Sequence, residues 1–348
     1  MATEEELASR PKALVILEVA SMAAILLFSV VGNILSCIVM YQNARLRTWH
    51  NLLLLNVIIA DLLAALICMP FVIAVLLTGR WALGRDSSCT ISGYFNALLA
   101  TVSVTSLAII SVSRYYLIVR FSDYIKIFKC RNVGVMSTAI WVVSAICTFP
   151  PVVGWGQYIF LPGGALCFLY FGSSVSYSTV FTVLMLGVPI LVMVFCFTKV
   201  YLVVRKRRRA TTPRETHKLK LIERKEISAA KTLFCVVVMV LLFWTPLVVI
   251  YILVSSGVTE IPRQVSLMTT FFALLPCACK PIIYFIMKLQ FRRAFLRLVL
   301  GRRLYKLFVQ VTPSGAGQKL ERGNSTKMEE TVNRTRNANI SEMAPTEN

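Results

Sequence analysis

The stretch LLPCACKPIIYF, residues 274–285, decides how this sequence folds. It is almost entirely apolar, yet it contains a lysine, Lys280, directly before Pro281. An ammonium group at the centre of a bilayer costs about 2.5–3.5 kcal/mol, so a lysine in a membrane span needs a buried partner or water. The stretch therefore raises two questions: whether it spans a membrane, and which group pairs with Lys280.

The composition of the whole chain is that of a membrane protein. Of its 348 residues, 57% are apolar and only 15% are charged, and the mean hydropathy is +0.71. A soluble domain carries about 25% charged residues. A helix that crosses the hydrocarbon core needs ~20 mostly apolar residues, and seven such runs predict an all-α bundle of seven transmembrane helices. The runs are residues 13–41, 49–76, 88–119, 133–153, 175–204, 228–255 and 264–287.

The formal charge of +21 does not indicate a nucleic-acid partner, because Lys and Arg are concentrated in alternate loops. Twenty-three lie in the loops after the first, third and fifth runs and in the segment 288–306, whereas the other loops and the amino-terminal segment contain five. Positively charged loops remain in the cytoplasm, so the amino terminus is predicted to be extracellular. The basic loops are also expected to contact anionic membrane lipid.

This topology divides the chain into three parts. Residues 1–12 form an extracellular tail, residues 13–300 form the seven-span domain with a short amphipathic helix, and residues 301–348 form a polar, disordered cytoplasmic tail. The opening MATEEELASRPK lacks the pattern of a cleaved signal peptide, so the first span is expected to act as its own insertion signal. We therefore expect a multi-pass protein of the plasma membrane.

Two of the ten cysteines, Cys89 and Cys167, face the oxidising side on this topology. Cys89 begins the third span and Cys167 lies in the loop between spans four and five. A disulfide between them would tie this loop over the mouth of the bundle. Cys277 and Cys279 are two residues apart and point in different directions on a helix, so no metal site is expected.

Each span carries a mark that resembles the rhodopsin-like (class A) G-protein-coupled receptors. The marks are Asn33 in GNILSCIV, Asp61 in NVIIADLLAAL, SRY at 113–115, Trp141, Pro189, FWTP at 243–246 and KPIIY at 280–284. Seven marks in order on seven spans form a specific pattern, whereas a single mark is weak. The resemblance covers residues 13–300 and implies a receptor, not an enzyme, that needs no cofactor and activates a heterotrimeric G protein.

The resemblance assigns a switch to the inner ends of the spans. It implies that Arg114 is held by an acid of span six in the inactive state, and Glu226, twenty residues before Pro246, occupies that position. Surface ion pairs contribute only about 0–1 kcal/mol, so the alternative is a solvated charge. We expect the ion pair. The switch also includes Tyr115 and Tyr284.

Two switch positions depart from the family pattern. Ser113 stands where the family has an acid, so one restraint on the inactive state is missing and we expect raised basal signalling. Phe197 replaces a tyrosine, which puts the active-state hydrogen bond to Tyr284 in doubt, although Tyr201 follows one turn later. A receptor-shaped protein that does not couple to G protein is an alternative that Ser113 and Lys280 leave open.

The partner of Lys280 is predicted from depth. Asp61 lies roughly ten residues, or about 15 Å, from the inner end of its span, and Lys280 lies about seven residues, or about 10 Å, from its own. Asn33 and Ser103 fall at a similar depth. The resemblance implies that Asp61 binds a sodium ion in relatives, where an asparagine or aspartate replaces Lys280. We therefore expect Lys280 to take the place of that ion.

Lysines in seventh spans also hold retinal in animal opsins, which the sequence resembles locally. In opsins this lysine lies seven residues before the proline, where the chain has Leu274, whereas Lys280 directly precedes Pro281. A retinal-binding photoreceptor is therefore the main alternative function. A transporter would show inverted repeats or broken helices along a polar path, and neither is evident.

The expected ligand pocket has few polar groups. Asn96, eighteen residues before Arg114, stands where amine receptors carry an aspartate, and a neutral amide offers no counter-charge to an amine. The resemblance adds further pocket positions, many of which ordinary helix packing would also explain. They are Phe181, Met185, Trp244, Leu247, Val248, Tyr251 and Thr270. We expect a neutral, lipophilic or small aromatic ligand.

Two further segments complete the resemblance. The stretch WALGRDSSCTISGY, residues 81–94, is similar to melatonin-type receptors. After span seven, Phe291, Ala294, Phe295 and Leu298 form one apolar stripe between arginines, which predicts an amphipathic helix on the membrane surface. The Ser- and Thr-rich tail that follows is the expected contact for a receptor kinase and arrestin.

Overall fold

The computed structural model describes residues 4–42, 49–81, 86–210, 217–255, 261–287 and 291–298. The chain forms two units, Met1–Arg292 and Arg293–Asn348, and the helices and strands named below belong to the first. Seven helices in the described part of the chain are long and apolar enough to cross a membrane, which confirms the predicted bundle. They are Lys12–Gln42, Leu52–Thr78, Ser87–Val119, Cys130–Val153, Val175–Lys206, Ala230–Ile250 and Arg263–Met287.

Five spans consist mainly of one α-helix each. These helices are α2 (Lys12–Gln42), α5 (Asp86–Val119), α7 (Cys130–Thr148), α10 (His217–Ser255) and α11 (Arg263–Met287). The short helix α1 (Glu4–Ala8) precedes the first span, α6 (Phe121–Ile127) follows the third, and the 3-10 turn η3 (Pro150–Val153) ends the fourth. Among these seven spans the third, α5, has the largest buried share, 67% against 17% for the first, α2, so α5 lies at the centre of the bundle.

The second and fifth spans are each interrupted by a π-helical turn. The second span consists of α3 (Trp49–Leu63), η2 (Ala64–Cys68) and α4 (Met69–Thr78), and the fifth of α8 (Val175–Thr182), η5 (Val183–Gly187) and α9 (Val188–Ala210). Each π-turn ends two residues before a proline, Pro70 or Pro189. A proline cannot donate to the carbonyl four residues earlier, so the widened turn accommodates the missing hydrogen bond.

A β-hairpin in the loop between spans four and five covers one end of the bundle. Strands β1 (Tyr158–Leu161) and β2 (Leu166–Leu169) pair antiparallel, with Phe160 opposite Cys167. The predicted disulfide Cys89–Cys167 is present and fastens β2 to the start of α5. The hydroxyl of Tyr158 donates to the carbonyl of Thr148 at 2.7 Å, and burial raises the pKa of Tyr158, so this donor stays protonated.

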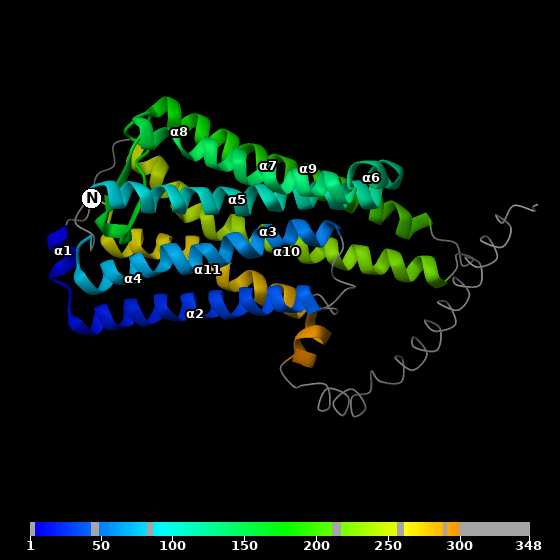
Figure 1. The fold of residues 1–348 in the computed structure, drawn as a ribbon, viewed down its shortest axis with the longest axis horizontal. Coiled ribbons are helices and arrows are strands. Elements are labelled where there is room, and N and C mark those ends of the chain that lie inside the picture. The colour runs from blue at the N-terminus through cyan, green and yellow to red at the C-terminus, as the bar shows by residue number, and fades with distance from the viewer. Residues whose placement is uncertain are drawn as a thin grey trace, which may run out of the picture. The chain divides into compact units, whose positions relative to one another are not determined.

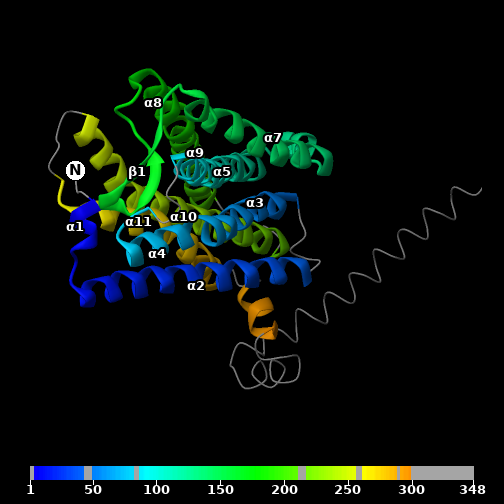
Figure 2. The same cartoon turned by 60° about the vertical axis from the view of Figure 1, so that its left-hand side comes forward.

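Figure 1 shows the helices side by side, with α1 and the hairpin at one end and α6 at the other. Figure 2 shows β1 and α1 at the same end from a second direction. We call these the hairpin end and the α6 end. Residues 291–298 are helical, in agreement with the predicted amphipathic helix. The predicted cytoplasmic tail, residues 301–348, lies outside the described residues.

Candidate functional site

A buried ion pair joins three spans inside the bundle. Lys280 of α11 donates through Nζ to Asp61 Oδ1 of α3 at 2.7 Å and to Ser103 Oγ of α5 at 2.7 Å. The Ser103 hydroxyl lies 3.3 Å from the same carboxylate oxygen, which closes a triangle of contacts. The three residues are only 2–7% exposed. Asp61, Ser103 and Lys280, which the sequence placed at similar depths in their spans, are therefore in contact in the structure.

Asn33 has a different role from the one that the sequence indicated. Its side-chain amide donates to the carbonyls of Ser29 at 2.8 Å and of Cys277 at 3.0 Å, and no ion-pair contact of Asn33 is found among the described residues. The Cys277 carbonyl is the one that Pro281, four residues later, leaves without its helical donor. Gly32 permits this approach, because a Cβ there would lie 2.9 Å from Pro281 Cβ. Asn33 thus supplies the hydrogen-bond donor that the Cys277 carbonyl lacks because of Pro281.

A cavity of about 70 Å³ adjoins the ion pair, and its lining includes Asp61, Ser103 and Lys280. Its walls come from α5, α10, α11 and strand β2. Of the predicted pocket residues, the cavity brings together Asn96, Trp244, Leu247 and Thr270. The lining also includes Leu166 and Phe168 of β2; the sequence indicated that the uncharged loop 157–171 contributes to the pocket, but not which of its residues, because a loop shows no helical periodicity.

The other predicted pocket residues lie elsewhere or are not described. Phe181 and Met185 pack in an apolar cluster with Tyr158, Leu169 and Tyr177 beneath the hairpin. Val248 is half-buried and is not part of the cavity lining. The side chain of Tyr251 lies outside the described residues.

The polar groups of the cavity bind the hairpin. Thr270 Oγ1 donates to the carbonyl of Gly164 at 2.9 Å, and Asn96 Nδ2 donates to Ser92 O at 3.2 Å and lies 3.5 Å from Cys167 O. Ligand sites of ordinary size enclose about 300–1,000 Å³, so this cavity is small for a ligand site. The hairpin contributes two apolar side chains to the cavity, and its backbone carbonyls accept from Thr270 and lie near Asn96.

The predicted switch residues lie toward the α6 end. Ser113 and Arg114 are buried, and the Ser113 hydroxyl has no hydrogen-bond partner within the part of the chain that the structure describes. Tyr284 is 1% exposed, whereas Tyr201 is 62% exposed and does not point into the bundle. The side chain of Glu226 lies outside the described residues, so the expected pair with Arg114 stays a prediction.

Aromatic contacts surround these switch residues. The Tyr115 ring packs against Phe195 with centroids 6.0 Å apart, and the Phe197 ring meets Phe234 edge-on at 5.4 Å. Phe197, which replaces the usual tyrosine, is therefore held by packing. Such edge-on pairs contribute about 0.5–1.5 kcal/mol beyond the burial of their area.

Comparison with known proteins gives one family and a consistent set of relatives. The family described as 7 transmembrane receptor (rhodopsin family) matches residues 32–284. The chain is 26% identical to Melatonin receptor type 1B-B of Danio rerio, over 86% of the chain and 87% of that protein. It is 27% identical to Melatonin receptor type 1A of Mus musculus, over 83% and 82%. The crystal structure of squid rhodopsin has the same fold, with a TM-score of 0.76 at 22% identity over 84% of this chain and 88% of that one.

Proposed function

The chain belongs to the rhodopsin family of seven-transmembrane receptors, the class A G-protein-coupled receptors, and on this premise we propose that a small ligand in the cavity controls the inner face of the bundle. The ligand is extracellular, neutral or lipophilic, and its binding opens the cytoplasmic face to a heterotrimeric G protein. The observation that carries the proposal is a single cavity that reaches from the hairpin to the Asp61–Lys280 pair.

The charge of the cavity supports a neutral ligand. Asp61 is the only carboxylate in the described lining, and Lys280 already pairs with it at 2.7 Å. An amine ligand would therefore bury an ammonium group without a counter-charge. Because two relatives are named as melatonin receptors, melatonin is the first compound to test.

The cavity must expand for such a ligand to bind. A ligand shifts a conformational equilibrium only by the difference between its affinities for the two states. An agonist would therefore bind better when the hairpin and the α10 wall, with Trp244 and Leu247, lie farther apart. Movement of α10 would reach the α6 end through Pro246, which interrupts the hydrogen bonds of this helix.

In the proposed orientation the amino terminus is extracellular and the α6 end faces the cytoplasm. Arg114, Tyr115 and Tyr284 then form the coupling surface, with Glu226 as the acid that releases Arg114. The cytoplasmic tail supplies sites for a receptor kinase and for arrestin, and the receptor lies in the plasma membrane.

Lys280 takes the place of a sodium ion in this proposal. Its Nζ lies within hydrogen-bond distance of Asp61 and Ser103, so the Asp61 carboxylate already has a cation that belongs to the protein. Ligand affinity should therefore not depend on sodium.

Basal output, compared across the G-protein classes, tests the proposal without a ligand. We expect output above that of cells without the receptor, because Ser113 provides no charge to hold Arg114. The variant Ser113→Asp should lower basal output severalfold, equivalent to about 1 kcal/mol in the activation equilibrium. The control for an added negative charge near this end of the bundle is Ser122→Asp, on the exposed part of α6, which should leave basal output unchanged. Equal output from the wild-type and Ser113→Asp receptors would contradict the missing-restraint argument.

Melatonin is tested separately by thermal stabilisation and by displacement of a labelled analogue. No basal output in any G-protein class, and no response to melatonin in a correctly folded receptor, would favour a protein that does not couple. Absorbance in the visible range after retinal is added would instead support photoreception. The fold likeness to squid rhodopsin does not by itself favour that function, because it shows the fold alone.

A further inference from the structure

A second buried ionic cluster lies at the hairpin end. Glu18 of α2 accepts from two arginines: Arg263, the first residue of α11, through Nη2 at 2.6 Å, and Arg10, which precedes the first span, through Nη1. All three side chains are only 4–7% exposed. Two guanidinium groups thus share one carboxylate, and no hydrogen-bond partner of Arg263 Nη1 is found among the described residues.

Arg10 fastens the amino-terminal segment to the bundle. Besides Glu18, it donates through Nη2 to the carbonyl of Leu76 at 2.7 Å and through Nε to the carbonyl of Leu7. Leu76 lies in the last turn of α4, where carbonyls lack helical donors and a cation is favoured by the helix dipole. One side chain therefore connects the segment to the first, second and, through Glu18, seventh spans.

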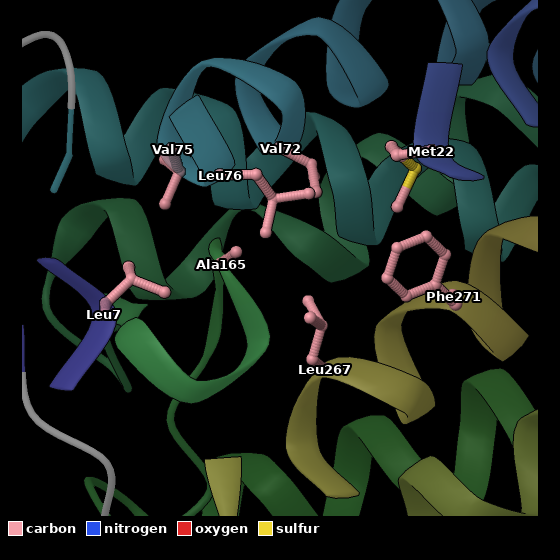
Figure 3. Close-up of a cluster of buried hydrophobic side chains, with 8 residues drawn as sticks. All are labelled: Leu7, Met22, Val72, Val75, Leu76, Ala165, Leu267 and Phe271. Atoms are coloured by element: carbon pink, nitrogen blue, oxygen red, sulfur yellow. The ribbon is translucent and has the colours of Figure 1, made fainter. Parts of the chain in front are cut away.

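Leu7 is inserted where these spans meet the hairpin. It is 1% exposed and belongs to a cluster that we call the mouth cluster, which Figure 3 shows with Leu7 directed from α1 toward the hairpin turn and α4. The members of this cluster are Leu7, Met22, Val72, Val75, Leu76, Ala165, Leu267 and Phe271. Leu7 therefore anchors α1 to the bundle by apolar packing.

The backbone of the segment also approaches the second span closely. Gly79 ends α4 with φ of 71°, and a Cβ on it would lie 2.9 Å from Ala8 Cα. Glycine is required here both by the positive φ and by this approach. Helix α1 also contacts the turn η4 (Pro162–Gly164) of the hairpin. Residues 4–10 are thus held by charge, by apolar packing and by backbone contact.

The mouth cluster is continuous with the cavity. Leu166 and Leu274 both line the cavity and pack against the mouth cluster. Thr270, whose hydroxyl holds the hairpin at Gly164, also lines the cavity and lies on α11 between Leu267 and Phe271 of the cluster. Leu7 of the amino-terminal segment is therefore connected to the cavity wall by one continuous set of apolar contacts, which includes Leu166 of the hairpin.

We propose that residues 4–10 are a gate over the ligand cavity, closed by Leu7 and latched by the Arg10–Glu18–Arg263 cluster. Exchange of molecules between the cavity and the hairpin end requires release of Arg10 from Glu18 and Leu76 and withdrawal of Leu7. The inference deepens the proposed function, since it rests on the cavity being the ligand site. The structural role of the gate does not depend on which G protein, if any, is activated.

The test measures access to the cavity directly. A thiol is introduced by Leu274→Cys in the full chain, and its reaction with a charged methanethiosulfonate reagent is followed on the detergent-purified protein by peptide mass spectrometry. Arg10→Ala, Glu18→Gln and deletion of residues 2–10 are each combined with it. We expect each to raise the reaction rate about tenfold or more, which corresponds to loss of ~1.4 kcal/mol from the closed state.

A matched control separates the latch from a general effect of charge. Glu5 belongs to the same segment but is exposed. Glu5→Gln makes the same chemical change as Glu18→Gln, and it should alter the rate by less than about twofold, because an exposed carboxylate contributes little. Cys68, which is 1% exposed and is not one of the residues that line the cavity, serves as the monitor of unfolding.

Unchanged reactivity of the introduced thiol after deletion of residues 2–10, with Cys68 unmodified, would overturn the proposal. If Glu18→Gln unfolds the protein, Arg10→Ala decides the question, because it leaves the Glu18–Arg263 pair in place. The assay contains no ligand and no G protein. If the variants raise the reaction rate of the thiol but the receptor does not signal, the gate is supported and the proposed function is contradicted. If the receptor signals but the rate does not change, the proposed function is supported and the gate is contradicted.

Discussion

The two buried ionic clusters differ in charge balance and in what they connect. Asp61 and Lys280 form a neutral pair between two spans inside the bundle, with Ser103 as a third partner. Glu18 faces two arginines at the hairpin end, and one of them, Arg10, precedes the first span. A neutral pair between spans fixes their packing, whereas an arginine from a short terminal segment can leave without separating any span. The group of Asp61, Lys280 and Ser103, which we call the inner cluster, therefore suits a permanent structural element. The group of Arg10, Glu18 and Arg263, which we call the outer cluster, suits a latch.

Removal of Lys280 should have the largest effect. Lys280→Ala leaves Asp61 charged and unpaired in the bundle, so we expect the free energy of unfolding to fall by about 3–5 kcal/mol. The measurement is the thermal midpoint of the purified receptor. Lys199→Ala, which removes an exposed lysine lying 5.6 Å from the Phe195 ring centroid, is the control and should cost less than about 1 kcal/mol.

The double variant Asp61→Leu and Lys280→Met checks the cause. Replacement of both charges by apolar groups of similar size is often neutral or stabilising, so it should recover most of the loss. A double variant as unstable as Lys280→Ala would show that packing, and not the unpaired charge, explains the effect.

Glu18→Gln should have a smaller effect on stability. It leaves two guanidinium groups together, but Arg10 and Arg263 lie near a helix end, where long side chains can turn toward water. We expect a loss of about 2 kcal/mol, the cost of leaving buried polar groups unsatisfied. The same thermal assay compares this variant with Lys280→Ala. A loss equal to or larger than that of Lys280→Ala would contradict the distinction between a structural pair and a latch.

The sequence predicted the inner cluster better than the outer one for a physical reason. Lys280 and Asp61 both lie in apolar spans, where helical rise gives their depth and any charge needs a partner. Arg10 lies before the first span, where no periodicity fixes its position. Glu18 was recognisable as a carboxylate near the outer end of its span, but its two partners depend on how the segment folds back.

The cavity shows the same limit of sequence reasoning. Asn96, Trp244, Leu247 and Thr270, which the resemblance assigned to a ligand pocket, do line one cavity, because helix positions carry over between related bundles. The presence of Leu166 and Phe168 in the cavity lining depends on the β-hairpin, whose path is fixed by the disulfide and by tertiary contacts. The π-turns η2 and η5 were also missed, although the prolines that follow them were visible in the sequence.

Sodium dependence tests the inner cluster more finely. In Lys280→Asn the cation of the protein is absent, so a sodium ion can pair with Asp61. We expect sodium, compared with N-methylglucamine at equal ionic strength, to stabilise this variant by about 1.4 kcal/mol, a tenfold change in equilibrium. The wild type should show no difference in the thermal midpoint. A sodium-sensitive wild type would contradict the substitution of Lys280 for the ion.

The smallest effect on stability is expected when the hydrogen bond from Thr270 to the hairpin is removed. Thr270→Val removes the donor to the Gly164 carbonyl and keeps the shape of the side chain, so the free energy of unfolding should fall by about 1 kcal/mol. Thr269→Val is the matched control, because Thr269 is buried and donates within its own helix, to Ser266 O at 2.7 Å. If the hairpin and the segment close the cavity together, Thr270→Val should also raise the reactivity of the thiol introduced by Leu274→Cys, by about threefold. If Thr269→Val raised the reactivity of this thiol by the same factor, loosening of α11 itself would expose the cavity. The outer cluster would then not control access to it.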